Sequence, residues 1–196
     1  MSAHILPPAP PVQRPRVVVV ATAFASAAAV MAFVTLLGVY LNKRASVIEA
    51  GSTWLPEGST IPLQQPNTML ITLIMSVITM AWAVNAISKN DRVNAFLALG
   101  FTLVLGIATL VMTTYLWTLM KLDVASGAQG VLIYTITGAH TIMLVLALVF
   151  TSLMALRALG GQFNSREHDG MSAAALFWYA MVAVYALIWI IIYVTK

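Results

Sequence analysis

The chain has 196 residues, of which 61% are hydrophobic and 8% are charged, and its mean hydropathy is +0.93. A soluble domain carries about 25% charged residues, so this composition cannot cover a soluble globule with a polar surface. It indicates an integral membrane protein whose solvent is mostly lipid.

The side chains also restrict the chemistry. There is no cysteine, which excludes disulfides, zinc–thiolate sites, iron–sulfur clusters and thiol nucleophiles. Of the histidines His4, His140 and His168, only His140 lies in an apolar segment, and one histidine cannot by itself build a haem, copper or zinc site. Paired carboxylates within a span, a glycine-rich phosphate loop and a nucleophile–base pair are also missing. We therefore expect no metal, no cofactor and no catalytic residue in this chain.

The net charge of +4 raises the question of whether the chain binds nucleic acid. The basic residues lie beside apolar segments, where they set topology and meet anionic lipid headgroups. We therefore expect lipid and not nucleic acid as the partner of these charges.

In chain order, residues 1–16 form a proline-rich tail that we expect to be flexible. Five apolar blocks follow, each reaching the ~20 residues that a spanning helix needs. They are 17–41, 68–88, 95–119, 131–156 and 173–194. The sequence predicts an all-α fold, with one polytopic bundle of five transmembrane helices over residues 17–196.

The first block has an alternative interpretation. Basic residues, a short apolar run and then Ala25-Ser26-Ala27 resemble a signal peptide with its cleavage site. The apolar run continues to Leu41, which is too long for a signal peptide, so we favour an uncleaved helix.

The basic residues predict an orientation. With the N-terminus in the cytoplasm and the C-terminus outside, the inner side holds Arg14, Arg16, Lys89, Arg92, Arg157 and Arg166, and the outer side holds Lys43, Arg44, Lys121 and Lys196. The longest loop, 42–67, then lies outside. It holds Trp54, Pro56 and Pro62, and we expect it to lie against the membrane surface or a partner.

The five blocks contain no Asp, Glu, Lys or Arg. Ion-coupled carriers usually keep an ionisable residue at membrane depth, so this chain is not expected to transport ions. Small residues such as Gly106 and Gly138 would let the helices pack closely.

Two short motifs and one tryptophan occur in a specific order along the chain. Pro66-Asn67-Thr68 opens the second block, Thr137-Gly138-Ala139-His140 lies early in the fourth, and Trp178 lies near the start of the last. In this order the chain resembles subunit III of the haem-copper oxidases, in the short five-helix form of bacterial cytochrome c oxidases and quinol oxidases.

The resemblance implies a non-catalytic, multi-pass subunit of the bacterial plasma membrane. It would pack beside subunits I and II, which carry the haem and copper. It would also hold phospholipid in a cleft and support proton uptake and oxygen reduction by subunit I, within a respiratory oxidoreductase.

The chain departs from the family at its polar positions. The family's membrane glutamate, its third-helix Gln and Glu, the second His of G-x-H-x-x-H and the His of the last helix correspond to Ala29, Thr113, Leu116, Met143 and Tyr179. The resemblance is therefore to a divergent member that keeps the helix frame.

Five residues are candidate contacts to lipid or a partner: His140, Arg157, Trp82, Arg92 and Trp178. For His140 the alternative, which we favour, is a hydrogen bond to a neighbouring helix or backbone carbonyl. Arg157 is a topology anchor that can also contact a lipid phosphate. Asn67 or Thr68 is expected to cap the second helix.

Two other functions remain open. The scaffold could serve as an accessory subunit of a nitric oxide reductase. A small multi-pass carrier is the other, although Asn85, His140 and dispersed Ser and Thr residues are its only polar groups. The Arg166-Glu167-His168-Asp169 cluster is most simply a solvated loop.

Overall fold

The computed structural model describes residues 16–56, 58–125, 127–163 and 168–195. These residues form five α-helices and one π-helical segment: α1 (Val17–Glu49), α2 (Gln64–Ser88), α3 (Arg92–Met120), α4 (Ala128–Leu159), α5 (Asp169–Ile188) and η1 (Trp189–Val194). No strand occurs among them. Five described helices, α5 being counted with η1, are long and apolar enough to cross a membrane, which confirms the predicted fold class. The expectations for residues 1–15 and 164–167 lie outside the described residues.

The helices extend beyond the apolar blocks. α1 continues past Leu41 to Glu49, and α2 begins at Gln64, so the long connection is 50–63 and not 42–67. Polar residues end a hydrophobic run without ending a helix, because the backbone hydrogen bonds continue into the membrane surface. Hydropathy therefore marks the membrane depth of a helix and not its full length.

The predicted cap of α2 is wrong. Leu63 occupies the N-cap position, and its side chain makes no capping bond. Asn67 and Thr68 lie one turn inside the helix, where the Asn67 amide donates to the Leu63 carbonyl and the Thr68 hydroxyl donates to the Gln64 carbonyl. Pro66 fits in the first turn because its missing N–H has no intrahelical acceptor there. The helix thus starts three residues before Asn67, the first of the two residues expected to cap it.

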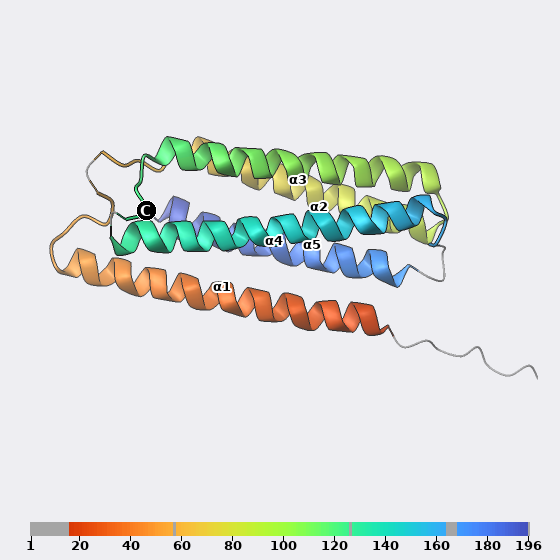
Figure 1. Cartoon of the computed structure of the whole chain (residues 1–196), viewed down its shortest axis with the longest axis horizontal. Coiled ribbons are helices and arrows are strands. Elements are labelled where there is room, and N and C mark those ends of the chain that lie inside the picture. The colour runs from red at the N-terminus through yellow and green to blue at the C-terminus, as the bar shows by residue number, and fades with distance from the viewer. Residues whose placement is uncertain (1–15, 57, 126, 164–167, 196) are drawn as a thin grey trace, which may run out of the picture.

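The helices run alternately in opposite directions along one bundle, so the start of α1 and the end of η1 lie at opposite ends of it (Figure 1). α2 and α3 form a closely packed hairpin, and α5 packs against α1, α4 and α2. α1 packs mainly against α5 and α4 and is the least buried of the helices. We call the end that holds Arg16 and the α2–α3 turn the inner end, and the opposite end the outer end.

The core is built largely on α5. Trp178 and Tyr185 on this helix and Tyr193 on η1 are almost completely buried, together with Tyr40 of α1. The outward faces carry bulky aliphatic side chains, such as Val104 on α3, 63% exposed. Such a surface suits contact with lipid chains.

The loop between α1 and α2 folds over the outer end. Trp54 is 5% exposed and packs edge-to-face on Tyr40, with ring centroids 5.3 Å apart. The Trp54 indole donates to the Tyr40 hydroxyl at 3.0 Å, and the Thr60 amide donates to the Met120 carbonyl. Trp54 belongs to the loop that was expected to lie against the membrane surface or a partner, and its side chain is buried within the chain.

Candidate functional site

His140 lies in the interior, where α1, α4 and α5 meet. Its Nε2 lies 3.3 Å from the Met181 carbonyl oxygen of α5. The Phe33 ring meets it edge-on, and the Tyr185 ring lies 5.3 Å away. His140 is 3% exposed, so lipid or a partner cannot reach it from outside. The alternative, a histidine bonded to a backbone carbonyl of a neighbouring helix, is confirmed.

Trp178 is fully buried, so the expected contact to lipid or a partner is wrong. Its indole crosses the bundle from α5 and donates to the Ser76 hydroxyl of α2 at 2.9 Å. An ideal Cβ added to Gly106 of α3 would lie 2.7 Å from the indole Cη2 atom. Glycine at this position lets the ring fit between the helices, as the small residues of the sequence indicated.

Two further hydrogen bonds tie α5 and η1 to the start of α2. The Tyr185 hydroxyl donates to the Pro66 carbonyl at 3.0 Å, and the Trp189 indole donates to the Asn67 side-chain oxygen at 2.8 Å. The Pro-Asn-Thr string therefore serves as an acceptor for aromatic donors. Sequence reasoning missed this role, although a buried Tyr or Trp generally requires a partner for its polar tip.

Three positions that the sequence comparison matched to polar residues of the family lie inside the bundle. Ala29 packs against the core from α1, and Met143 is buried on α4. Thr113 is buried on α3 and donates to the Thr109 carbonyl of its own helix. None of these three side chains is ionisable.

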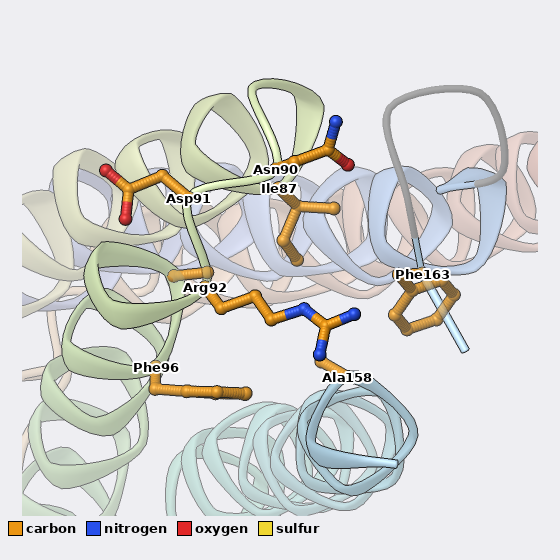
Figure 2. Close-up of a pocket in the computed structure, with 8 residues that line it drawn as sticks. Ile87, Asn90, Asp91, Arg92, Phe96, Ala158 and Phe163 are labelled. Carbon is orange, nitrogen blue, oxygen red and sulfur yellow. The ribbon is translucent and has the colours of Figure 1, made fainter. Parts of the chain in front are cut away.

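A pocket opens at the inner end (Figure 2). The end of α4 with the residues after it contributes Ala158 and Phe163, and the α2–α3 hairpin contributes Ile87, Asn90, Asp91, Arg92, Ala95 and Phe96. The Arg92 side chain extends across the pocket toward Phe163. Two of the candidate residues, Arg92 and Arg157, are far apart in the sequence but lie close to each other around this pocket.

Arg157 is exposed next to this pocket. Its guanidinium carbon lies 5.7 Å from the centre of the Phe163 ring, and its Nε donates to the Gln162 side-chain oxygen at 2.8 Å. Arg16 and Asp169 form an exposed ion pair of 3.5 Å between the starts of α1 and α5. Asp169 belongs to the 166–169 cluster that was expected to be a solvated loop, and its carboxylate forms an ion pair with Arg16.

Asp91 lines the pocket and caps α3. Its side chain accepts from the Asn94 backbone amide at 3.2 Å and from the Asn94 side-chain amide at 2.6 Å. These donors, the side-chain amide first, lower the pKa of Asp91 below its ordinary value of 3.8. The carboxylate is thus held charged at the positive end of the helix dipole.

Trp82 is 39% exposed on the surface of α2 and does not line the pocket. Among the described residues, no group of three or more His, Asp or Glu side chains is arranged to hold a metal ion. The candidate site is therefore a set of surface contacts at the inner end, around a rigid interior.

These features define a multi-pass α-helical membrane protein whose polar groups serve packing and surface contact. The family described as Cytochrome c oxidase subunit III matches residues 19–196. The chain belongs to this family, which confirms the resemblance of the sequence motifs.

Among similar proteins are cytochrome c oxidase subunit 3 of Drosophila melanogaster, 29% identical over 167 residues, and that of Anopheles gambiae, 30% identical over 148 residues. The protein of Cyprinus carpio is 27% identical over 156 residues. The matches cover 84%, 74% and 79% of this chain and 64%, 56% and 60% of the relatives. The chain thus spans about three fifths of the length of these relatives.

Proposed function

We propose that this chain is the non-catalytic third subunit of a respiratory terminal oxidase, packed beside subunits I and II. The single observation that carries this proposal is the family match over residues 19–196. In this role the chain supports oxygen reduction and proton uptake by subunit I, and the haem and copper belong to its partners. Either cytochrome c or a quinol would supply the electrons.

The described surface supports a role in packing. The outer faces of α3 and α4 expose aliphatic side chains, including Val104 and Leu146. Residues 93–120 and 128–156 of these helices contain no Asp, Glu, Lys or Arg whose charge a neighbouring subunit or lipid chain would have to desolvate. The interior is fixed by its own hydrogen bonds. A rigid apolar body of this kind stabilises a neighbour by contact.

We place the inner end in the cytoplasm of a bacterial cell, with the chain in the plasma membrane. Arg16, Lys89, Arg92 and Arg157 gather at that end of the bundle, and basic residues favour the cytoplasmic side. The bacterial assignment follows from the resemblance to the short five-helix form.

Phospholipid would contact Arg92, Arg157 and Trp82. All three are exposed, and the two arginines lie at or near helix ends, at the depth of lipid headgroups. Buried His140 and Trp178 instead hold the helices in place.

The test is co-purification. The tagged full chain is expressed in its native membrane and solubilised in a mild detergent, with an unrelated polytopic protein carrying the same tag as control. We expect a haem-containing oxidase subunit to accompany the chain and not the control, and the chain separated from it to show no haem absorbance.

Other outcomes identify the other candidates. A haem partner that reduces nitric oxide and not oxygen would assign the chain to a nitric oxide reductase. If no haem subunit co-purifies and the reconstituted chain alone conducts or takes up a solute, the oxidase proposal is refuted in favour of a carrier.

A further inference from the structure

The two halves of α1 are held very differently. In the outer half, Leu37 and Tyr40 are at most 2% exposed. In the inner half, 17–32, Ser26 is the one buried side chain. α1 and α4 also diverge toward the inner end of the bundle, so that α5 is the main neighbour of α1 there (Figure 1). Few buried contacts mark the parts of a protein that open most easily.

A surface ion pair secures the inner end of α1. Arg16, at the N-cap position of α1, pairs with Asp169, the first residue of α5, at 3.5 Å. The two side chains are 70% and 39% exposed, so water and salt reach the pair and weaken it. The two helices run in the same direction from this point. We call the contact between the inner half of α1 and α5 the α1–α5 seam.

A buried hydroxyl opposes the closure of this seam. Ser26 is 5% exposed, and within the part of the chain that the structure describes its hydroxyl has no hydrogen-bond partner. Thr35, exposed on the same helix, donates to the Met31 carbonyl one turn earlier at 2.9 Å. Away from α5, the Ser26 hydroxyl is free to rotate and make the corresponding bond to the Thr22 carbonyl. An unpaired buried hydroxyl is costly, so this bond favours the open seam.

We propose that the inner half of α1 is a gate over the α1–α5 seam. The ion pair of Arg16 and Asp169 closes it, and the unpaired hydroxyl of Ser26 favours its opening. The gate swings about the level of Phe33, whose ring meets His140 of α4 edge-on. When it is open, the seam is accessible from the apolar interior of the membrane, and salt at the inner surface promotes opening. This goes beyond the proposed function, because the gate does not depend on the complex that the chain joins.

Distances between pairs of spin labels test the gate in the full chain, reconstituted in lipid nanodiscs. The chain has no native cysteine, so the introduced ones are the only labelled sites. The inner pair is Val18→Cys with Leu156→Cys, and the outer pair is Leu41→Cys with Val131→Cys. All four positions are at least 41% exposed. We expect two populations of distances for the inner pair and one narrow distance for the outer pair.

Substitutions assign the two populations to the gate. Arg16→Gln and Asp169→Asn should each raise the ratio of open to closed by up to about fivefold, the limit for an exposed ion pair. High salt should do the same to the wild type and nothing further to Arg16→Gln. Ser26→Ala should lower the ratio about fivefold by removing the unpaired hydroxyl. Thr151→Val is the matched control, because it removes another unpaired buried hydroxyl, on α4, and should leave the ratio unchanged.

A single narrow inner distance that neither salt nor the Arg16 and Asp169 variants alter would overturn the proposal. Equal ratios for Ser26→Ala and Thr151→Val would also overturn it. So would an outer distance that broadens together with the inner one, because α1 would then loosen as a whole and have no hinge near Phe33. Thermal unfolding checks that each variant is folded.

Discussion

Replacing Gly106 by alanine tests the central packing of the bundle. The new Cβ would lie 2.7 Å from the Trp178 Cη2 atom and 2.8 Å from the Leu148 Cδ2 atom. Carbon atoms in contact rest about 3.5 Å apart, so the indole must retreat by about 0.8 Å. Leu148 can change rotamer, but the Trp178 ring is fully buried and hydrogen-bonded to Ser76. Overpacking of this kind costs about 1–3 kcal/mol.

The same geometry predicts a rescue. Trp178→Phe removes both indole atoms that crowd Gly106, Cη2 and Cζ2. In that background Gly106→Ala should cost much less, although Trp178→Phe is itself destabilising because Ser76 loses its donor. The two substitutions should therefore couple by at least about 1 kcal/mol in a double-mutant cycle.

The assay is equilibrium unfolding in mixed micelles with increasing SDS, followed by far-ultraviolet circular dichroism. Gly100→Ala is the matched control on the same helix, because nothing lies within 4 Å of a Cβ added there. It should be neutral or stabilising by up to about 1 kcal/mol. If Gly106→Ala matches this control, or adds to Trp178→Phe within about 0.5 kcal/mol, the close approach of ring and helix is refuted.

Two further predictions concern the ends of the bundle. Because the pKa of folded Asp91 is lowered, its cap stabilises α3 above pH 3.8 and is lost as the pH falls through the lowered value. Between about pH 6 and about pH 2 the unfolding midpoint of the wild type should fall more than that of Asp91→Asn; equal slopes would contradict this. Trp54→Phe removes the bond to Tyr40, which should cost about 1 kcal/mol and speed proteolysis within residues 50–63. Tyr40→Phe should do the same, and unchanged cleavage in both would show that this bond does not hold the loop.

The sequence predicted the number of spans and their positions because lipid imposes one requirement on every spanning segment. In the hydrocarbon core no water is present, so the backbone N–H and C=O groups must form their hydrogen bonds within each helix. Only long apolar segments are stable in that environment. Helix ends were less predictable. Residues 42–49 include Asn42, Lys43, Arg44, Ser46 and Glu49, yet they continue α1, because helical hydrogen bonds do not require an apolar environment.

Which side of each helix faces inward was not readable from the sequence. A helix that is apolar all round gives little amphipathic signal, so Trp178 was interpreted as an exposed contact although it is fully buried. Its partner Ser76 lies 102 positions away, and no local pattern links the two. The inner-end pocket likewise depends on the α4 end returning to the α2–α3 turn. Both arginines were recognised as candidates, but their proximity was not.

The sequence positions of α1 and its neighbours affect the order of assembly. α2 and α3 adjoin in the chain and can pair as soon as both have entered the bilayer. α1 enters before them, yet its main contacts are with α4 and α5. Its main contacts within this chain can therefore form only after the later segments α4 and α5 have been synthesised and inserted. During that interval its alanine-rich surface is open to foreign helices, so insertases or partner subunits that shield it would protect the nascent protein.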